Sequence, residues 1–262
     1  MQSANSRVPE MLNKVPEVTL AFWVIKIMST TVGETGADYL AVHVGLGTAI
    51  TSTVTASLLL AALFQQLRMR RYVPWIYWLT VVLVSIVGTQ ITDALTDGLG
   101  VSLYVSTAAF AAALAITFAV WYRSEHTLSI HTIVTTRREL FYWAAILFTF
   151  ALGTAAGDLA TEALGLGFNV GVLVFGALIA AIGAAYYLGA NAVLTFWLAY
   201  ILTRPLGASL GDLLSQARTY GGLGLGTVTT SLAFLIVIVA LVTFVSFDAR
   251  RARLDEGAGG TP

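Results

Sequence analysis

The chain contains no cysteine among its 262 residues, and only 11% of the residues are charged. The lack of cysteine excludes disulfides, zinc–thiolate sites and cysteine-ligated iron–sulfur clusters. The scarcity of charge excludes more, because an average soluble protein has about 25% charged residues. Hydrophobic residues make up 57% of the chain and the mean hydropathy is +0.82, so too little polar surface remains to cover a water-soluble globule. We therefore expect a polytopic membrane protein, and we exclude soluble enzymes, disordered proteins and nucleic-acid binders.

Long apolar runs recur along the whole chain, each close to the about 20 residues that a spanning helix needs. They predict one all-α membrane domain over residues 1–262 with a disordered tail at 255–262. The eight expected transmembrane helices are 17–38, 46–67, 74–95, 101–122, 139–161, 168–189, 191–214 and 224–247.

Most basic side chains flank the side of these helices on which both termini lie, and only Arg218 lies in a loop on the other side. The side chains on the terminal side are Arg7, Lys14, Arg68, Arg70, Arg71, Arg123, Arg137, Arg138, Arg250, Arg251 and Arg253. The positive-inside rule therefore predicts that both termini are cytoplasmic.

A pattern of tryptophan, glycine and aspartate at fixed spacing, Trp-x9-Gly-x4-Asp, occurs four times, once in each odd-numbered helix. The four copies are Trp23–Gly33–Asp38, Trp78–Gly88–Asp93, Trp143–Gly153–Asp158 and Trp197–Gly207–Asp212. A Gly-Leu-Gly follows each copy, at 45–47, 98–100, 165–167 and 224–226. The pattern predicts four parallel two-helix repeats at 17–70, 72–123, 138–189 and 191–247. Such repeats can close into a pseudo-fourfold ring or pair as two four-helix halves.

These repeats resemble a family of bacterial membrane proteins built from four tandem two-span repeats with a characteristic tryptophan, catalogued as a repeat of unknown function. The resemblance covers about residues 15–247 and rests on the segments KIMSTTVGETGAD (26–38), GTAAGD (153–158) and TRPLGASLGD (203–212). It implies a multi-pass protein of the bacterial cytoplasmic membrane. It implies no mechanism, so function must be argued from the residues.

Polar groups of the odd-numbered helices fall on one stripe, about 140° wide at 100° per residue. The stripe includes position +7 after each tryptophan (Thr30, Ser85, Phe150 and Arg204) and position +11 (Glu34, Thr89, Thr154 and Ala208). A polar stripe in lipid must face other helices or a watery cavity. We therefore expect the odd-numbered helices to lie inside and the even-numbered helices to form an outer ring.

The residues of the repeat pattern each allow two interpretations. The tryptophans Trp23, Trp78, Trp143 and Trp197 either anchor the protein at the membrane interface or line and plug an inner vestibule. The glycines either allow close helix packing or mark a broken-helix ion site.

The aspartates Asp38, Asp93, Asp158 and Asp212 either cap helix ends or bond to the Gly-Leu-Gly backbone of the next turn, or they form a ring of carboxylates that attracts cations. Asp97 and Glu162 stand four residues after Asp93 and Asp158, and His43 stands five after Asp38. Together they suggest a hard divalent metal such as Mn²⁺ or Mg²⁺, although no classical metal-ligand spacing is present.

Three charged residues break the fourfold pattern: Lys26 and Glu34 in the first repeat and Arg204 in the fourth. A charge in mid-membrane costs about 2.5–3.5 kcal/mol on insertion scales, so it should be paired. We expect Lys26 to pair with a group on another inner helix, and Arg204 to pair with Glu34 or an aspartate. These pairs are either structural or part of a coupling mechanism in which a cation or proton competes for a carboxylate. Pro205 either breaks the seventh helix or is a tolerated kink.

The favoured hypothesis is a transporter of a small cation, with proton coupling possible. The alternatives are a pseudo-fourfold cation channel and a membrane sensor or assembly module that does not transport. We expect no enzymatic activity, since no nucleophile–base pair or Walker motif is present. We also expect no cofactor and no nucleic-acid partner, and the sequence leaves an oligomer possible.

Overall fold

The computed structural model describes the backbone of residues 13–42 and 48–258 and the side chains of residues 13–40 and 48–247. Within these residues the only regular secondary structure is helical, and no strand is present. The eight α-helices are α1 (Leu20–Val42), α2 (Thr48–Arg68), α3 (Pro74–Asp93), α4 (Leu103–Glu125), α5 (Thr136–Asp158), α6 (Gly167–Tyr187), α7 (Ala192–Ser215) and α8 (Thr227–Ala258). The prediction of an all-α, eight-helix fold is confirmed.

Seven helices, α2 to α8, are long and apolar enough to cross a membrane. The remaining helix, α1, has 23 residues but carries Lys26, Glu34 and Asp38, so it is less apolar than the others. It contacts α3, α7 and α8, which shield it. The chain is therefore a multi-pass membrane protein whose most polar helix lies among the others.

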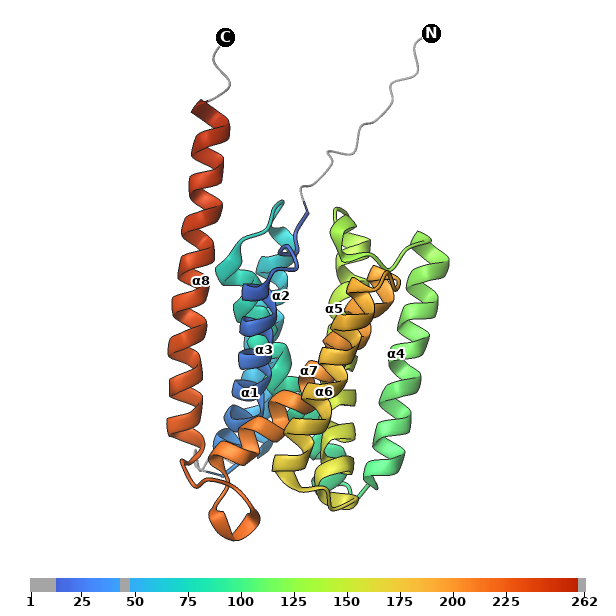
Figure 1. The fold of residues 1–262 in the computed structure, drawn as a ribbon, viewed down its shortest axis with the longest axis vertical. Helices are drawn as coiled ribbons and strands as arrows, with labels where there is room; N and C mark the ends of the chain where they lie inside the picture. The colour runs from blue at the N-terminus through green and yellow to red at the C-terminus, as the bar shows by residue number, and fades with distance from the viewer. Residues whose placement is uncertain (1–12, 43–47, 259–262) are drawn as a thin grey trace.

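The helices run alternately up and down, so all odd-numbered helices start at the same end of the bundle (Figure 1). We call this the tryptophan end, and the opposite end the aspartate end. The start of α1 and the last turns of α8 both lie at the tryptophan end (Figure 1). Helix α8 continues to Ala258, past the end expected at residue 247, and residues 259–262 lie outside the described chain. Residues such as Ala252, Leu254 and Glu256 favour helix formation, so the helix continues beyond its apolar part into what we expected to be a disordered tail.

The four odd-numbered helices form a closed ring. Helix α1 packs against α3 and α7, and α5 packs against the same two helices. The ring excludes the alternative of two separate four-helix halves.

Each outer helix packs mainly on the inner helix of the following repeat. Helix α2 lies against α3, α4 against α5 and α6 against α7, while α8 closes the circle against α1. The two helices of one repeat hardly touch in comparison. The repeats are therefore interlocked, and the hairpin of the sequence is not the packing unit.

Burial separates the inner ring from the outer one as the polar stripe predicts. More than half of the apolar stretch of α3, α5 and α7 is buried, against less than a quarter in α2, α4, α6 and α8. Large apolar side chains of the outer helices, such as Leu60, Leu173 and Ile236, are exposed on the bundle surface. Lipid tails suit such a surface.

The repeat glycines hold the inner ring together by close packing. Each glycine faces position +7 of the next repeat, and the glycine of the fourth repeat faces position +7 of the first. A Cβ atom on Gly33, Gly88, Gly153 or Gly207 would lie 1.8 Å from Ser85 Oγ, 2.7 Å from Phe150 Cβ, 2.5 Å from Arg204 Cβ or 1.8 Å from Thr30 Oγ1. No side chain fits at such distances, so the close-packing interpretation is confirmed and the ring repeats the same contact four times.

Glycine is also required in the Gly-Leu-Gly turns at the aspartate end. The last glycine of three turns, Gly100, Gly167 and Gly226, has φ of +67°, +70° and +79°. Side-chain-bearing residues rarely adopt this left-handed conformation. The first turn, residues 45–47, lies outside the described chain.

Candidate functional site

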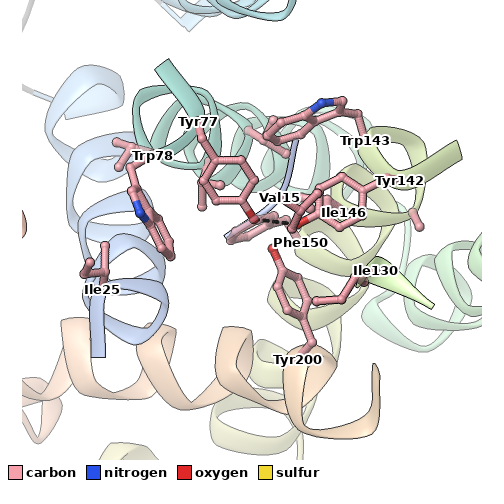
Figure 2. Close-up of a cluster of buried hydrophobic side chains, with 14 of the residues drawn as sticks. Val15, Ile25, Tyr77, Trp78, Ile130, Tyr142, Trp143, Ile146, Phe150 and Tyr200 are labelled. Atoms are coloured by element: carbon pink, nitrogen blue, oxygen red, sulfur yellow. Dashed lines mark hydrogen bonds between the residues drawn. The ribbon is translucent and has the colours of Figure 1, made fainter. Parts of the chain in front are cut away.

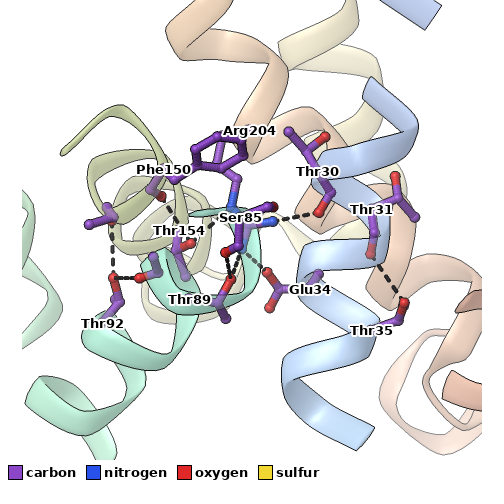
Figure 3. Close-up of polar contacts among 12 residues, drawn as sticks. Thr30, Thr31, Glu34, Thr35, Ser85, Thr89, Thr92, Phe150, Thr154 and Arg204 are labelled. Atoms are coloured by element: carbon purple, nitrogen blue, oxygen red, sulfur yellow. Dashed lines mark hydrogen bonds and ion pairs between the residues drawn. The ribbon is translucent and has the colours of Figure 1, made fainter. Parts of the chain in front are cut away.

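The guanidinium of Arg204 lies at the centre of the inner ring and binds all three other inner helices (Figure 3). Its Nη2 lies 2.5 Å from Glu34 Oε2 on α1 and also donates to Thr89 Oγ1 on α3. Its Nε donates to Thr154 Oγ1 on α5 at 3.0 Å, and its Nη1 donates to the carbonyl of Thr30 at 2.6 Å. The guanidinium is fully buried, and the predicted pair with Glu34 is confirmed.

The three side chains that accept these bonds occupy the same repeat position. Glu34, Thr89 and Thr154 are the +11 residues of repeats one to three, so the ring directs all three toward one point. The fourth repeat has Ala208 at this position, and the side chain of Arg204 takes the remaining space. The repeat symmetry thus brings three polar side chains together at the centre of the ring. Arg204, which departs from the symmetry, completes the cluster.

Pro205 follows Arg204 directly. Helix α7 continues through Pro205 from Ala192 to Ser215, so the proline does not end the helix. Its ring packs close to Gly153 and Gly157 of α5. The interpretation as a tolerated proline fits this geometry better than a broken helix.

Lys26 is also fully buried but has no hydrogen-bond partner among the described residues. Its ammonium nitrogen lies 3.8 Å from the ring centre of Phe150 on α5 and 4.2 Å from that of Tyr200 on α7. The expected pairing with other inner helices therefore takes the form of cation–π contacts. Phe150 also lies 6.0 Å from the Arg204 guanidinium carbon, so one ring separates the two cations.

An aromatic layer closes the ring on the side of Lys26 (Figure 2). Trp78, Trp143 and Trp197 are at most 5% exposed, whereas an interfacial anchor would lie at the surface. An aromatic residue precedes each tryptophan, and two of these, Tyr77 and Tyr142, join their hydroxyls at 2.5 Å. Trp23 is partly exposed and packs edge-on against Phe22. The layer geometry favours the plugging interpretation of the tryptophans.

The four aspartates follow on the other side of the Arg204 cluster. Asp212 is buried and Asp38, Asp93 and Asp158 are partly exposed. None of these carboxylates has a hydrogen bond or ion pair within the described chain, and Asp93 and Asp158 cap no helix. The described residues therefore give no support to the capping interpretation, and the first Gly-Leu-Gly turn, residues 45–47, lies outside them.

Asp93 and Asp158 are each followed by a π-helical turn, at Ala94–Gly98 and Leu159–Ala163. Such wide turns occur frequently at functional sites. They carry Asp97 and Glu162, which are both exposed. No three His, Asp or Glu side chains in the described residues are grouped so as to hold a metal ion. His43 lies outside the described residues.

Two features of the site were not expected from the sequence. The aromatic partners of Lys26 could have been inferred from the stripe, because Phe150 and Tyr200 lie at positions +7 and +3 of their repeats. Lys14, which we counted among the basic flanking residues, is instead fully buried and paired with Glu139. The one signal in the sequence that could have indicated this pair is Glu139, an acid in the first turn of an apolar helix.

No curated protein and no solved structure matches the chain. The family model of the Repeat of Unknown Function (DUF347) matches residues 21–72, 76–127, 141–190 and 195–251. These four matches coincide with the four interlocked repeats and cover most of the chain. The chain therefore belongs to the family of membrane proteins built from the Repeat of Unknown Function (DUF347).

Proposed function

We propose that the protein is a membrane transporter of a small cation, with a pathway along the axis of the inner ring. The observation that carries the proposal is the Arg204–Glu34 pair on that axis, next to four aspartates that have no hydrogen-bond or ion-pair partner among the described residues. A structural bundle has no need of an axial ion pair whose charges must be removed from water. A cation attracted by the aspartates would compete with Arg204 for the Glu34 carboxylate.

The axis is filled, which favours a transporter over an open pore. Arg204, Phe150 and Lys26 occupy its middle, and the tryptophan layer closes one end. Passage of a cation would require Arg204 to leave Glu34 and move toward its hydroxyl partners Thr89 and Thr154. This exchange gives a basis for alternating access, because the Glu34 carboxylate binds either the cation or Arg204 but not both. A proton on Glu34 would release Arg204 in the same way, which allows proton coupling.

The proposed substrate is a cation that keeps much of its hydration. The described residues have no three-ligand metal group, so a fully dehydrated Mn²⁺ or Mg²⁺ would lack ligands there. Four carboxylates at one end of the ring attract cations by their field without chelating them.

The second candidate is a pseudo-fourfold cation channel, which the closed ring of four inner helices favours. The buried guanidinium of Arg204 on the axis opposes it, since its positive charge repels the permeant ion. Single-channel currents would support the channel, and saturable, pH-coupled flux would support the transporter. The third possibility, a sensor or assembly module, would have no flux at all.

We also propose that the tryptophan end faces the cytoplasm of a bacterial cell. Basic residues are concentrated at this end, as the positive-inside rule requires of a cytoplasmic side.

The decisive experiment is cation flux into proteoliposomes with Mn²⁺, Mg²⁺, Na⁺, K⁺ and H⁺ tested separately. Wild type is compared with Asp93→Asn/Asp158→Asn and with Glu34→Gln, and Glu17→Gln serves as control because Glu17 is an exposed acid at the opposite end. We expect flux of one cation that both site variants abolish and the control retains. A folded, correctly inserted protein that moves none of these ions would overturn the proposal.

A further inference from the structure

The irregular segment before α1, residues 13–16, is buried across the tryptophan end of the inner ring. Lys14 is fully buried, Val15 is 4% exposed and Pro16 is buried. Segments outside the helices near a chain end are usually exposed. The burial of three successive residues therefore needs a specific cause, and we call residues 13–16 the strap.

Lys14 ties the strap to two helices. Its ammonium donates to Glu139 Oε2 on α5 at 2.5 Å and to the carbonyl of Leu67 on α2 at 3.0 Å. Gln66 of α2 donates to the second oxygen of Glu139 at 3.1 Å. Both charged side chains are at most 1% exposed, so neither has water as an alternative partner while the strap is in place.

Val15 belongs to the buried aromatic cluster at this end of the ring, together with Tyr77 and Tyr142 (Figure 2). It belongs to the same buried cluster as Trp78 and Phe150. A cation that has passed Arg204 and Lys26 would therefore meet Val15 before leaving the ring.

The strap has few other attachments. Every hydrogen bond that the described part of the strap makes to another element comes from Lys14, through its ammonium and its backbone N–H to the carbonyl of Ile133 at 3.2 Å. A buried ion pair is weak evidence of stability, because removing both charges from water costs about as much as their attraction returns. Losing one charge, however, leaves the other buried alone and drives the segment out. Within the described chain, Lys14 thus supplies all the polar attachment of the strap to other elements.

We propose that residues 13–16 are a displaceable plug of the ring, latched by the Lys14–Glu139 pair, and that the latch must open for passage. This inference rests on the proposed transport along the axis. It assigns the second gate of the pathway, at the end opposite the aspartates.

The natural absence of cysteine allows a direct test, since an introduced thiol is the only one present. Val15→Cys reports the strap position through its rate of labelling by a water-soluble maleimide in proteoliposomes. Glu17→Cys, at an exposed position, measures the unhindered rate. The latch is opened with Glu139→Gln or, independently, with Lys14→Met. Glu125→Gln is the matched control, because it removes the acid of a partly exposed ion pair between the end of α4 and Arg138 in the first turn of α5.

We expect Val15→Cys to react at least about tenfold faster in either latch variant, with Glu17→Cys and the Glu125→Gln background unchanged. Cation flux in the same vesicles should rise with the labelling rate. Equal labelling of Val15→Cys and Glu17→Cys with the latch intact would overturn the plug, as would unchanged labelling in the latch variants. If one of the two latch variants does not fold, the labelling rate in the other variant tests the proposal.

The two proposals fail in distinguishable ways. Faster labelling in a protein that moves no cation would retain the displaceable strap and refute transport. Faster labelling without a change in an existing flux would refute the gating role of the strap while leaving transport in place.

Discussion

Arg204 and Glu34 are 170 residues apart in the sequence, yet their side chains meet at 2.5 Å on the axis of the inner ring. The first and fourth repeats supply the pair, and hydroxyls of the second and third repeats complete the shell. The contact therefore joins all four repeats at one point. Changes at this point should affect stability and function together.

Replacing Arg204 with methionine should destabilise the protein by about 3–5 kcal/mol, because Glu34 is left buried without its countercharge. The double variant Arg204→Met/Glu34→Gln should recover much of this loss, since no lone charge remains. Unfolding in mixed micelles measures both values. Equal stability of the single and double variants would contradict the pairing.

Lys26 should behave differently from Arg204 because it has no hydrogen bond to lose. Lys26→Met keeps an unbranched side chain, one atom shorter, beside Phe150 and Tyr200, and removes the buried amino group. We expect the melting temperature to stay level or rise while cation flux falls at least about tenfold. A loss of stability with unchanged flux would identify Lys26 as a structural residue only.

The repeat glycines should not tolerate even one added carbon. Gly33→Ala would place a methyl group 1.8 Å from Ser85 Oγ, and overpacking of this kind costs about 1–3 kcal/mol. Adding Ser85→Gly should restore stability, because it removes the atoms that clash. Gly183→Ala on α6 is the control, since nothing lies within 4 Å of its Cβ position, and thermal unfolding of the three variants provides the comparison.

The aspartates should prove dispensable for folding. Asp93→Asn/Asp158→Asn should change the free energy of unfolding by less than about 0.5 kcal/mol, because neither carboxylate bonds to the described chain. A loss in the range of about 0.5–2 kcal/mol, typical of removed helix caps, would instead show a structural role. Chemical denaturation of the double variant and of the wild type measures this change in the free energy of unfolding.

Much of the inner ring could be predicted from local patterns. The spacing of Trp143, Gly153 and Asp158, repeated in the other copies, revealed the repeat. Helical periodicity then placed Thr89, Thr154 and Glu34 on one inward stripe. The partner of Arg204 was narrowed to Glu34 or a repeat aspartate, because few buried charges were available, and the structure chose Glu34.

The neighbours of each helix could not be predicted in this way. All four inner helices carry nearly the same stripe, so no segment specifies whether an outer helix packs on its own repeat or on the next. The structure places α2 on α3 and α8 on α1, a choice that packing between distant segments makes and that no single segment encodes.

The sequence by itself determined the membrane class, the four repeats and the residues that face inward, since composition and periodicity are properties of single segments. Only the tertiary structure decided the closed ring, the aromatic surroundings of Lys26 and the burial of Lys14 against Glu139. These depend on side chains from distant segments competing for the same space, and packing in three dimensions settles that competition.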